Sequence, residues 1–383
     1  MALLGAPAAG GPLLARTAGV ASRLDLLLTT GPRAALAHRR TAIRHARMQT
    51  GAIAAVDERI WRGAAAHAGA EVSEAGGGIL ELRRAGRATR VLGHITELED
   101  PVTLRLSLDR QAVHGLLAGA GVPVPANGTY GAADLRRAGR KLVSAGDAVV
   151  VKPASGTGGG HGITCSVRSP SDLARAAVCA MRFGSRFTLE RQVDGSMYRL
   201  LFLHGELLDV VRRDPPHVVG DGSTTVAGLI LAENRRRVAA GGDLGVTLIR
   251  PDLDAVLTLR AAGLTLGSIP APGRRLRVKT SSSENGPHEN VTVRDALHAA
   301  VLRDARAAVG ALGMRLAGVD LVTPDLGRDM REAGGAIVEV NATPGLRYHY
   351  QVADPGSATP VAVPILEHLL RDGPRKSDDR RER

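Results

Sequence analysis

Lysine is scarce for so basic a chain: Lys141, Lys152, Lys279 and Lys376 are the only lysines among 50 basic residues, and arginine supplies the rest. The ammonium group of lysine is a compact point charge, whereas the guanidinium group of arginine is a planar fork. A lysine that persists in such an arginine-rich chain indicates a position where a point charge is needed. Lys152 and Lys279 both lie next to polar, turn-forming segments.

Cysteine, aromatic residues and long apolar runs are also rare. Cys165 and Cys179 are the only cysteines, which form neither a disulfide framework nor a zinc site, so we expect a cytoplasmic protein. Aromatic residues make up 2% of the chain, which leaves little material for stacking bases. No apolar run approaches the roughly 18 residues that a membrane span needs, so we expect no membrane association.

Basic residues outnumber acidic ones and give a formal net charge of +12. A polyanion such as a nucleic acid would be one explanation. The arginines, however, are dispersed among alanine, glycine and acidic residues rather than gathered in one block, which is typical of solvated helix faces. We therefore expect no nucleic-acid partner. The positive charge also suits a site for a phosphorylated ligand.

Periodicity and breakers predict an α+β chain in three parts. Residues 1–103 form a small N-terminal domain, with helices over 33–48 and 56–68 and strands over 78–82 and 89–92. Residues 104–371 form the main domain, and residues 372–383 a charged tail that we expect to be disordered. The elements expected in the main domain are helices over 109–118, 132–144, 171–181, 295–312 and 360–370, and strands over 148–151, 187–190, 198–202, 207–211, 317–322 and 336–340.

A glycine-rich loop follows the predicted strand over 148–151. Lys152 and Pro153 lead into Ser155-Gly156-Thr157-Gly158-Gly159-Gly160-His161-Gly162. Glycines let backbone N–H groups turn toward phosphate oxygens, and a lysine at the strand end can neutralise a phosphate. The loop has neither the Gly-Lys-Ser/Thr ending of a P-loop nor the order of a dinucleotide fingerprint. A plain flexible turn explains the glycines equally well.

Two predicted strands near the C-terminus carry a candidate metal site. Glu339 and Asn341 are two residues apart, so they share one face of a strand, and Asp320 lies on the preceding strand. Two carboxylates and an amide oxygen suit Mg²⁺. The alternative is a hairpin with exposed polar residues. Apolar Val338 and Val340, together with the sharp turn at 342–345, favour the metal site.

Two further segments contain candidate binding residues. In Leu189-Glu190-Arg191-Gln192-Val193, a strand that leaves one lobe could offer its backbone to an adenine edge, although the pattern alone is weak. Adjacent Arg212 and Arg213 near a nucleotide site suit a carboxylate or an acyl phosphate held by forked bonds, and a surface turn is the alternative. Lys279, followed by the polar run 280–285, could form a second anion-binding loop.

Taken in order, these segments resemble the ATP-grasp superfamily, and within it the ATP-grasp part of cyanophycin synthetase and of bifunctional glutathione synthetases. The resemblance spans 104–370. Its motifs are VVVKP from Val149, the glycine-rich loop, LERQVDG from Leu189, YRLL from Tyr198, RRDPPHVVGDGSTTVAGLI from Arg212, GVDLVTPD from Gly318 and VEVNATPGLRYH from Val338. It implies an ATP-grasp fold, in which two α+β lobes clamp ATP, behind a small N-terminal α/β domain.

The resemblance also implies roles for individual residues. Arg110 stands where the family commonly has a nucleotide-binding lysine, Lys152 is similar to the phosphate-binding lysine, and the loop from Ser155 to Gly162 to the lid over the phosphates. Glu190, Arg191 and Val193 correspond to the adenine hinge. Asp320, Glu339 and Asn341 correspond to the ligands of one or two Mg²⁺ ions, with Mn²⁺ as an alternative. Arg213 and Arg347 are similar to holders of the carboxylate or acyl phosphate, and Lys279 joins them as a catalytic candidate.

The activity implied is an ATP-dependent, ADP-forming ligation of a small carboxylate, an amino acid or peptide, to an amine, in a fold compatible with a homodimer. A phosphotransferase of the same fold and a nucleotide-binding module with little turnover are the alternatives. Arg110, and Met197 at the ribose-binding acid's position, favour the binding module. The Mur-ligase-like domain of cyanophycin synthetase has no counterpart here, so we do not expect the complete cyanophycin activity from this chain.

Overall fold

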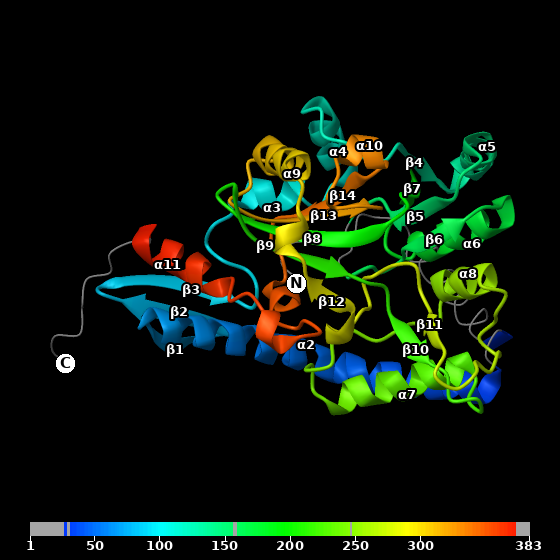
Figure 1. The fold of residues 1–383 in the computed structure, drawn as a ribbon, viewed down its shortest axis with the longest axis horizontal. Coiled ribbons are helices and arrows are strands. Elements are labelled where there is room, and N and C mark those ends of the chain that lie inside the picture. The colour runs from blue at the N-terminus through cyan, green and yellow to red at the C-terminus, as the bar shows by residue number, and fades with distance from the viewer. Residues whose placement is uncertain (1–26, 29–30, 156–158, 246, 373–383) are drawn as a thin grey trace.

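The computed structural model describes residues 27–28, 31–155, 159–245 and 247–372, and the predicted tail over 372–383 lies almost wholly outside them. A five-stranded sheet of order β12-β9-β8-β13-β14 forms the centre of the molecule (Figure 1). Its strands are β8 (Ser196–Leu203), β9 (Glu206–Arg213), β12 (Asn290–Thr292), β13 (Leu316–Thr323) and β14 (Ala336–Asn341). The strands predicted over 198–202 and 207–211 are confirmed as the antiparallel pair β8 and β9, and His204 and Gly205, both with positive φ, form the hairpin turn between them.

Helices cover one face of this sheet. They are α3 (Pro101–Leu106), α4 (Arg110–Gly119), α9 (Ala299–Ala311) and the short α10 (Met330–Ala333). Leu117 of α4 and Val309 of α9 pack against Leu200, Val319 and Ile337 of the sheet. The Asp109 side chain accepts hydrogen bonds from the backbone N–H groups of residues 111 and 112, which fixes where α4 begins. The site described below lies on the sheet face away from these helices.

A second lobe contains the four-stranded sheet β4-β7-β5-β6. Its elements are β4 (Asn127–Gly131), η1 (Ala132–Asp134), α5 (Leu135–Ala145), β5 (Val149–Pro153), β6 (Thr164–Val167), α6 (Pro170–Ala180) and β7 (Arg186–Arg191). Val151, Leu173 and Phe187 are fully or almost fully buried in its core. The two sheets with their helices match the α+β architecture expected from the sequence.

The chain leaves the central sheet after β9 and returns to it at β12, and the insert between them has its own small core, which includes Ile230, Ile249 and Leu259. The elements of the insert are β10 (His217–Val219), α7 (Val226–Ala239), α8 (Leu253–Ala261), β11 (Arg275–Arg277) and η2 (Pro287–Glu289). After β12 comes η3 (Arg294–Ala296), and the chain closes with η4 (Leu346–His349), η5 (Pro355–Ser357) and α11 (Ala362–Asp372). None of the helices described is both long enough and apolar enough to cross a membrane.

The N-terminal part departs from the prediction. One helix, α2 (Pro32–Ala68), replaces the two that were predicted, and it lies against α7 and α11 (Figure 1). Gly51 lies inside this helix. An interior glycine is less favourable than alanine by only about 1 kcal/mol, which packing can offset. The sheet β1 (Glu71–Gly76), β2 (Ile79–Arg84) and β3 (Arg87–Leu92) follows. The largely exposed β1 was missed because it lacks an apolar alternation.

The proposed division at residue 103 stays a prediction, because the first part shares a core with later elements. Trp61 of α2 and Leu82 of β2 lie in one apolar cluster with Leu201 of β8 and Ile365 of α11. All four side chains are buried. The N-terminal part therefore buries its apolar surface against the central sheet.

This shared core makes a testable prediction. Leu201 is 0% exposed, so Leu201→Ala should lower the free energy of unfolding by about 2–5 kcal/mol through the lost contacts and the cavity. Trp61, the only tryptophan, reports on the N-terminal part by fluorescence, and far-UV circular dichroism reports on the whole chain. We expect both denaturation midpoints to fall together.

The control is Val102→Ala, at a side chain 77% exposed, which should change the free energy of unfolding by less than about 0.5 kcal/mol. A Trp61 transition that stays in place while the circular dichroism transition shifts would show that the N-terminal part unfolds on its own.

Candidate functional site

A row of charged side chains crosses the central sheet on one face. Asp320 of β13 lies opposite Arg199 of β8 on one side and opposite Glu339 of β14 on the other. The Arg199 guanidinium makes a forked contact with Asp320: Nε donates to Oδ1, and Nη2 donates to Oδ2 at 2.6 Å. Arg199 is 5% exposed and Asp320 is 3% exposed. Burial would lower the pKa of Arg199, but Asp320 outweighs this and raises it, so the guanidinium stays charged.

Arg110 extends the row from α4. Its Nη2 lies 2.9 Å from Oε1 of Glu339. Burial would raise the pKa of Glu339, but the charges of Arg110, Lys152 and Arg199 outweigh this and lower it. An isolated β-bridge between Asp109 and Ser155 joins the start of α4 to the glycine-rich loop.

Lys152 approaches the same region from the other lobe. Its Nζ donates to Oε2 of Glu190 at 2.5 Å, from β5 to the neighbouring β7. Lys152 is 7% exposed and Glu190 is 1% exposed. The other oxygen of Glu190, Oε1, is buried without a hydrogen-bond partner among the described residues and lies 3.8 Å from Nε2 of His114. A buried polar atom without a partner is costly and is typical of a site that a ligand completes.

These residues form a set of matched charges. The pKa of Arg110, lowered by burial, is raised more strongly by Glu339, Glu190 and Asp320, so all three carboxylates act on this one cation. The three cations of the site are thus matched by three carboxylates, in the pairs Arg110–Glu339, Lys152–Glu190 and Arg199–Asp320. The site bridges the two lobes and presents cations and carboxylates in alternation.

The glycine-rich loop is described only in part, since Gly156, Thr157 and Gly158 lie outside the described residues. Ser155 is exposed, and Gly159 and Gly160 have positive φ. A Cβ on Gly160 would fall 2.2 Å from Cβ of Ser283, so glycine is required where this loop crosses the insert. The carbonyl of Gly160 accepts a hydrogen bond from Nη2 of Arg250 at 3.2 Å.

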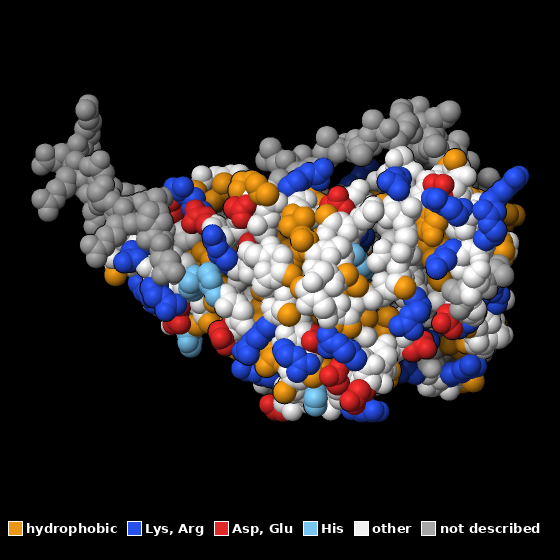
Figure 2. Space-filling model, turned by 90° about the horizontal axis from the view of Figure 1, so that it is seen from above, with side chains coloured by type: hydrophobic (Ala, Val, Ile, Leu, Met, Phe, Trp, Pro, Cys, Tyr) orange, Lys and Arg blue, Asp and Glu red, His pale blue; other side chains and the backbone are white. Residues whose placement is uncertain are grey.

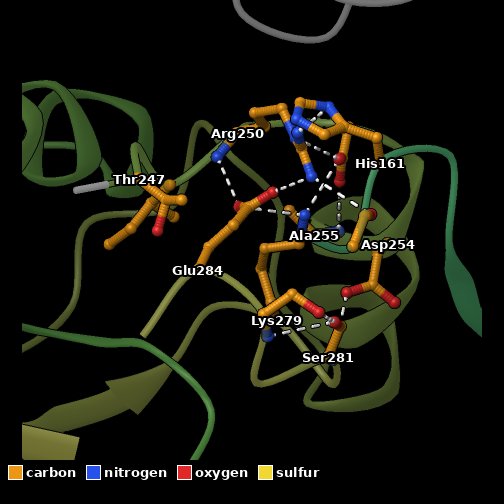
Figure 3. A network of polar contacts seen from close by, with 12 residues as sticks. His161, Thr247, Arg250, Asp254, Ala255, Lys279, Ser281 and Glu284 are labelled. Carbon is orange, nitrogen blue, oxygen red and sulfur yellow. Dashed lines mark hydrogen bonds and ion pairs between the residues drawn. The ribbon is translucent and has the colours of Figure 1, made fainter. Parts of the chain in front are cut away.

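Lys279 belongs to a separate network, shown in Figure 3. Its Nζ lies 2.9 Å from Oδ2 of Asp252 and 3.1 Å from Oε2 of Glu284. Arg250 contacts Glu284 and also Nδ1 of His161 at 2.7 Å. Burial, followed by the charge of Arg250, lowers the pKa of His161 to about 4. Lys279 is therefore paired with carboxylates of the insert, while Arg213 contacts the segment that follows Lys279, at the carbonyl of Ser282.

Arg213 and Arg347 meet instead at Tyr348. The guanidinium carbons of Arg213 and Arg347 lie 4.0 and 4.6 Å from the centre of the Tyr348 ring. Arg213 is 5% exposed, and its Nε is buried without a hydrogen-bond partner among the described residues. Burial lowers the pKa of Arg213. A buried cation without a carboxylate partner suits an anionic ligand.

The remaining predicted residues have simpler surroundings. Arg191 is exposed, and its backbone N–H donates to the carbonyl of Ala126 at 2.8 Å. Val193 and Met197 are half-buried. Asn341 donates through Nδ2 toward the carbonyl of Gly318 at 3.4 Å, which leaves its side-chain oxygen available. No group of three or more His, Cys, Asp or Glu side chains with the arrangement of a metal site occurs in the described part of the chain.

That finding is compatible with the expected ligand set, which has two carboxylates and one amide. Asp320 and Glu339 are cross-strand partners, and Asn341 follows Glu339 by two residues on β14. Hard oxygen donors of this kind fit Mg²⁺, which commonly keeps waters and takes phosphate oxygens as further ligands. The donor set therefore fits the ion.

Arg199 and Tyr348 are the two residues of the site that the sequence did not single out. Arg199 stands inside a strand whose neighbours, Leu200 to Leu203, are apolar and buried. The available signal was strand alternation: Arg199 faces away from its buried neighbour Leu200, and the pairing of β8 with β13 places it beside Asp320. Tyr348 gave no such signal, because Arg199 and Arg213 reach it from strands distant in sequence.

Basic and acidic residues intermingle on the surface. Figure 2 shows Lys and Arg side chains spread over the upper face with Asp and Glu among them, rather than gathered in one patch. This face offers no continuous basic footprint of the kind that nucleic acids bind.

Comparison with known proteins gives a consistent set of relatives, although no protein-family model matches the chain. The cyanophycin synthetase of Nostoc sp. is 33% identical over 282 residues, which is 73% of this chain and 31% of that protein. The glutathione biosynthesis bifunctional protein of Mannheimia succiniciproducens is 28% identical over 264 residues, 67% of this chain and 34% of that protein. The chain spans about a third of the length of these curated relatives.

A solved structure agrees with these sequence relatives. The crystal structure of a bifunctional glutathione synthetase from Pasteurella multocida is 25% identical and superposes with a TM-score of 0.51, covering 79% of this chain and 42% of that one. The match spans more of the chain than the glycine-rich loop and the charged row alone. It therefore supports the arrangement of the two lobes as well as the motifs.

The buried pair of Arg199 and Asp320 makes a prediction for stability. Arg199→Ala leaves the Asp320 carboxylate buried without its cation, which should destabilise the fold by about 3–5 kcal/mol. Chemical denaturation followed by circular dichroism measures this. The matched control Arg199→Lys keeps the charge but loses the fork, so its loss should be smaller. Equal stability of Arg199→Ala and the wild type would contradict the pairing.

Proposed function

We propose that this chain, which belongs to the ATP-grasp carboxylate–amine ligases related to cyanophycin synthetase and to bifunctional glutathione synthetase, forms an amide bond through an acyl phosphate, using ATP. The observation that carries the proposal is the matched set of buried charges between the lobes. Cations that can receive phosphates there lie beside carboxylates that can receive a metal ion. This is the environment that phosphoryl transfer requires.

The phosphates would be held by Lys152 and Arg110. Both are presently paired with carboxylates, at 2.5 Å to Glu190 and 2.9 Å to Glu339. The backbone of the loop from Ser155 to Gly160 would cover the β- and γ-phosphates. Glu190, Arg191 and Val193 would line the adenine side, where β7 ends.

Asp320, Glu339 and Asn341 would hold one or two Mg²⁺ ions, or Mn²⁺. When bound, the metal neutralises charge on the phosphates during transfer. The chain's own contribution is to position these oxygens: Arg199 fixes both oxygens of Asp320, and the pairing of β13 with β14 places Glu339 beside it. The low pKa of Glu339 keeps it ionised for this role.

The acceptor carboxylate would bind at Arg213 and Arg347. Arg213 contributes a buried guanidinium whose Nε lacks a partner among the described residues, and the guanidinium carbon of Arg347 lies 4.6 Å from the centre of the Tyr348 ring. The carboxylate attacks the γ-phosphorus, the bond from that phosphorus to the bridging oxygen of ADP breaks, ADP leaves with the electron pair, and an acyl phosphate forms. An amine then attacks the acyl carbon, the amide bond forms, and inorganic phosphate leaves.

The substrates that we propose are a small carboxylate, an amino acid or peptide, and an amine. The N-terminal domain over 1–103 and the insert over 231–290 would set the choice between them, because they flank the site without supplying its phosphate- or metal-binding groups. Lys279 acts within the insert, where it is bonded to Asp252 and Glu284. Its role is then to support the loop that follows it, up to Asn285.

The nucleotide-binding module is the second candidate. Two observations favour it: Met197 is half-buried where an acid would bind ribose, and Arg110 replaces a lysine. Neither Met197 nor Arg110 takes part in the ion pair between Asp320 and Arg199. The same experiment separates the two functions.

The test measures release of ADP and phosphate from Mg-ATP in parallel reactions, each with one amino acid or dipeptide as carboxylate and one amine. Release that requires both substrates, and that the Asp320→Ala/Glu339→Ala variant loses by at least about 10²-fold, is the expected result, because the positioned metal stabilises the transferring phosphoryl group. Wild type with each substrate alone is the matched control. Circular dichroism of the variant checks that it is folded.

Other outcomes would overturn the ligase. Release that needs one acceptor and no amine would favour a phosphotransferase. ATP binding by calorimetry without release in any reaction would favour the binding module, and Met197→Glu should then strengthen ATP binding if the missing ribose acceptor is the cause.

A further inference from the structure

Tyr348 lies in a ring of arginines that come from three elements. Nη2 of Arg347, from η4, donates to the Tyr348 hydroxyl oxygen at 2.9 Å. Arg213, from β9, stacks on the ring at 4.0 Å, and Arg199, from β8, lies 5.5 Å from its centre. Tyr348 is half-buried. Its hydroxyl is therefore oriented by Arg347, on a side chain that is only partly buried.

Two of the three arginines around the Tyr348 phenol have no carboxylate partner among the described residues. Asp320 pairs with Arg199. No carboxylate forms an ion pair with Arg213 or Arg347 within the part of the chain that the structure describes. Arg213 instead donates to the carbonyl of Ser282 at 3.4 Å. A negative charge on the Tyr348 oxygen would be the local counter-charge for both arginines.

The titration of Tyr348 follows from this geometry. Burial alone would raise the pKa of the phenol, but Arg347, Arg213 and Arg199 outweigh it and lower the pKa to about 8. Tyr350, two residues on, shows the opposite: burial raises its pKa, and its oxygen accepts a hydrogen bond from the backbone N–H of Ala362 at 3.0 Å. Tyr348 and Tyr350 lie two residues apart, and the opposite shifts of their pKa values follow from the arginines around Tyr348.

We propose that the Tyr348 phenolate removes a proton from the ammonium group of the incoming amine, acting as the general base of amide formation. This inference rests on the proposed ligase function. Amines bind largely as ammonium ions near neutral pH and cannot attack until they lose a proton. A base is most effective when it titrates near the working pH.

The ammonium proton passes to the Tyr348 oxygen, and the freed nitrogen lone pair forms the bond to the acyl carbon. The bond from that carbon to the phosphate oxygen breaks, and the phosphate leaves with the electron pair and takes the second proton of the nitrogen. Tyr348 then returns its proton to water. Arg213 and Arg347, already placed to hold the acyl group, keep Tyr348 ionised between turnovers.

The first experiment needs no substrate. Among the four tyrosines of the chain, one should ionise with a midpoint of about pH 8, seen as tyrosinate absorbance in the ultraviolet. Tyr348→Phe should remove this transition, and Tyr350→Phe should keep it. A wild-type protein in which no tyrosine ionises before the ordinary range near pH 10 would overturn the proposal.

The second experiment separates the base from the acyl phosphate. Hydroxylamine is largely unprotonated at neutral pH and traps acyl phosphates as hydroxamates without a base. With a carboxylate that supports ADP release, Tyr348→Phe should lower kcat/KM for the amine by about 10²–10³-fold and change hydroxamate formation by less than about twofold. The loss for the amine should shrink at higher pH, where the amine deprotonates without help.

The outcomes distinguish the two claims. An equal loss of hydroxamate and amide in Tyr348→Phe would overturn the base and leave the ligase standing. A wild-type protein that forms no hydroxamate with any carboxylate would overturn the ligase, and the base with it. Tyr350→Phe, whose hydroxyl lies outside the arginine ring, should match the wild type in both reactions.

Discussion

The structure depends on the pairing of buried cations with buried carboxylates between its two lobes. A charge removed from water is tolerated only when a partner compensates it. Arg199 with Asp320, Arg110 with Glu339 and Lys152 with Glu190 provide this compensation. A nucleotide with its metal ion would bring new charges of both signs: negative phosphates for the cations and a positive metal ion for the carboxylates. Partners could then be exchanged without leaving any charge unpaired, which suits a site that must open and refill in each cycle.

The same principle applies to the buried charges of the insert. Lys279 and Arg250 are compensated by Asp252 and Glu284 within the insert, so that network does not draw on the carboxylates of the central sheet. Arg250 links this network to the glycine-rich loop through His161 and the Gly160 carbonyl (Figure 3). The insert also contacts the second lobe at α8, where Asp254 accepts a hydrogen bond from the backbone N–H of Cys165 at 2.8 Å and Leu253 and Leu257 join that lobe's core.

Sequence reasoning succeeded where a rule of short range applied. Alternation along β14 and its pairing with β13 placed Glu339 beside Asp320, and a buried strand before Lys152 predicted β5. It failed where distant segments decide. Nothing local shows that α2 continues through Gly51, because α7 and α11 support it from elsewhere in the chain. The pairing of Lys152 with Glu190 and the arginine ring at Tyr348 likewise arise from tertiary contacts.

The scarcity of lysine now has a physical interpretation. Of the lysines described, Lys152 and Lys279 are buried, and each ammonium contacts carboxylates at 2.5–3.1 Å. A point charge suits such a narrow acidic pocket, where a guanidinium would leave several N–H groups without acceptors. Arginine serves where its plane matters, in the fork on Asp320 and in stacking on Tyr348. The choice between the two cations therefore follows the shape of the partner, and exchanging one for the other at these positions is not conservative.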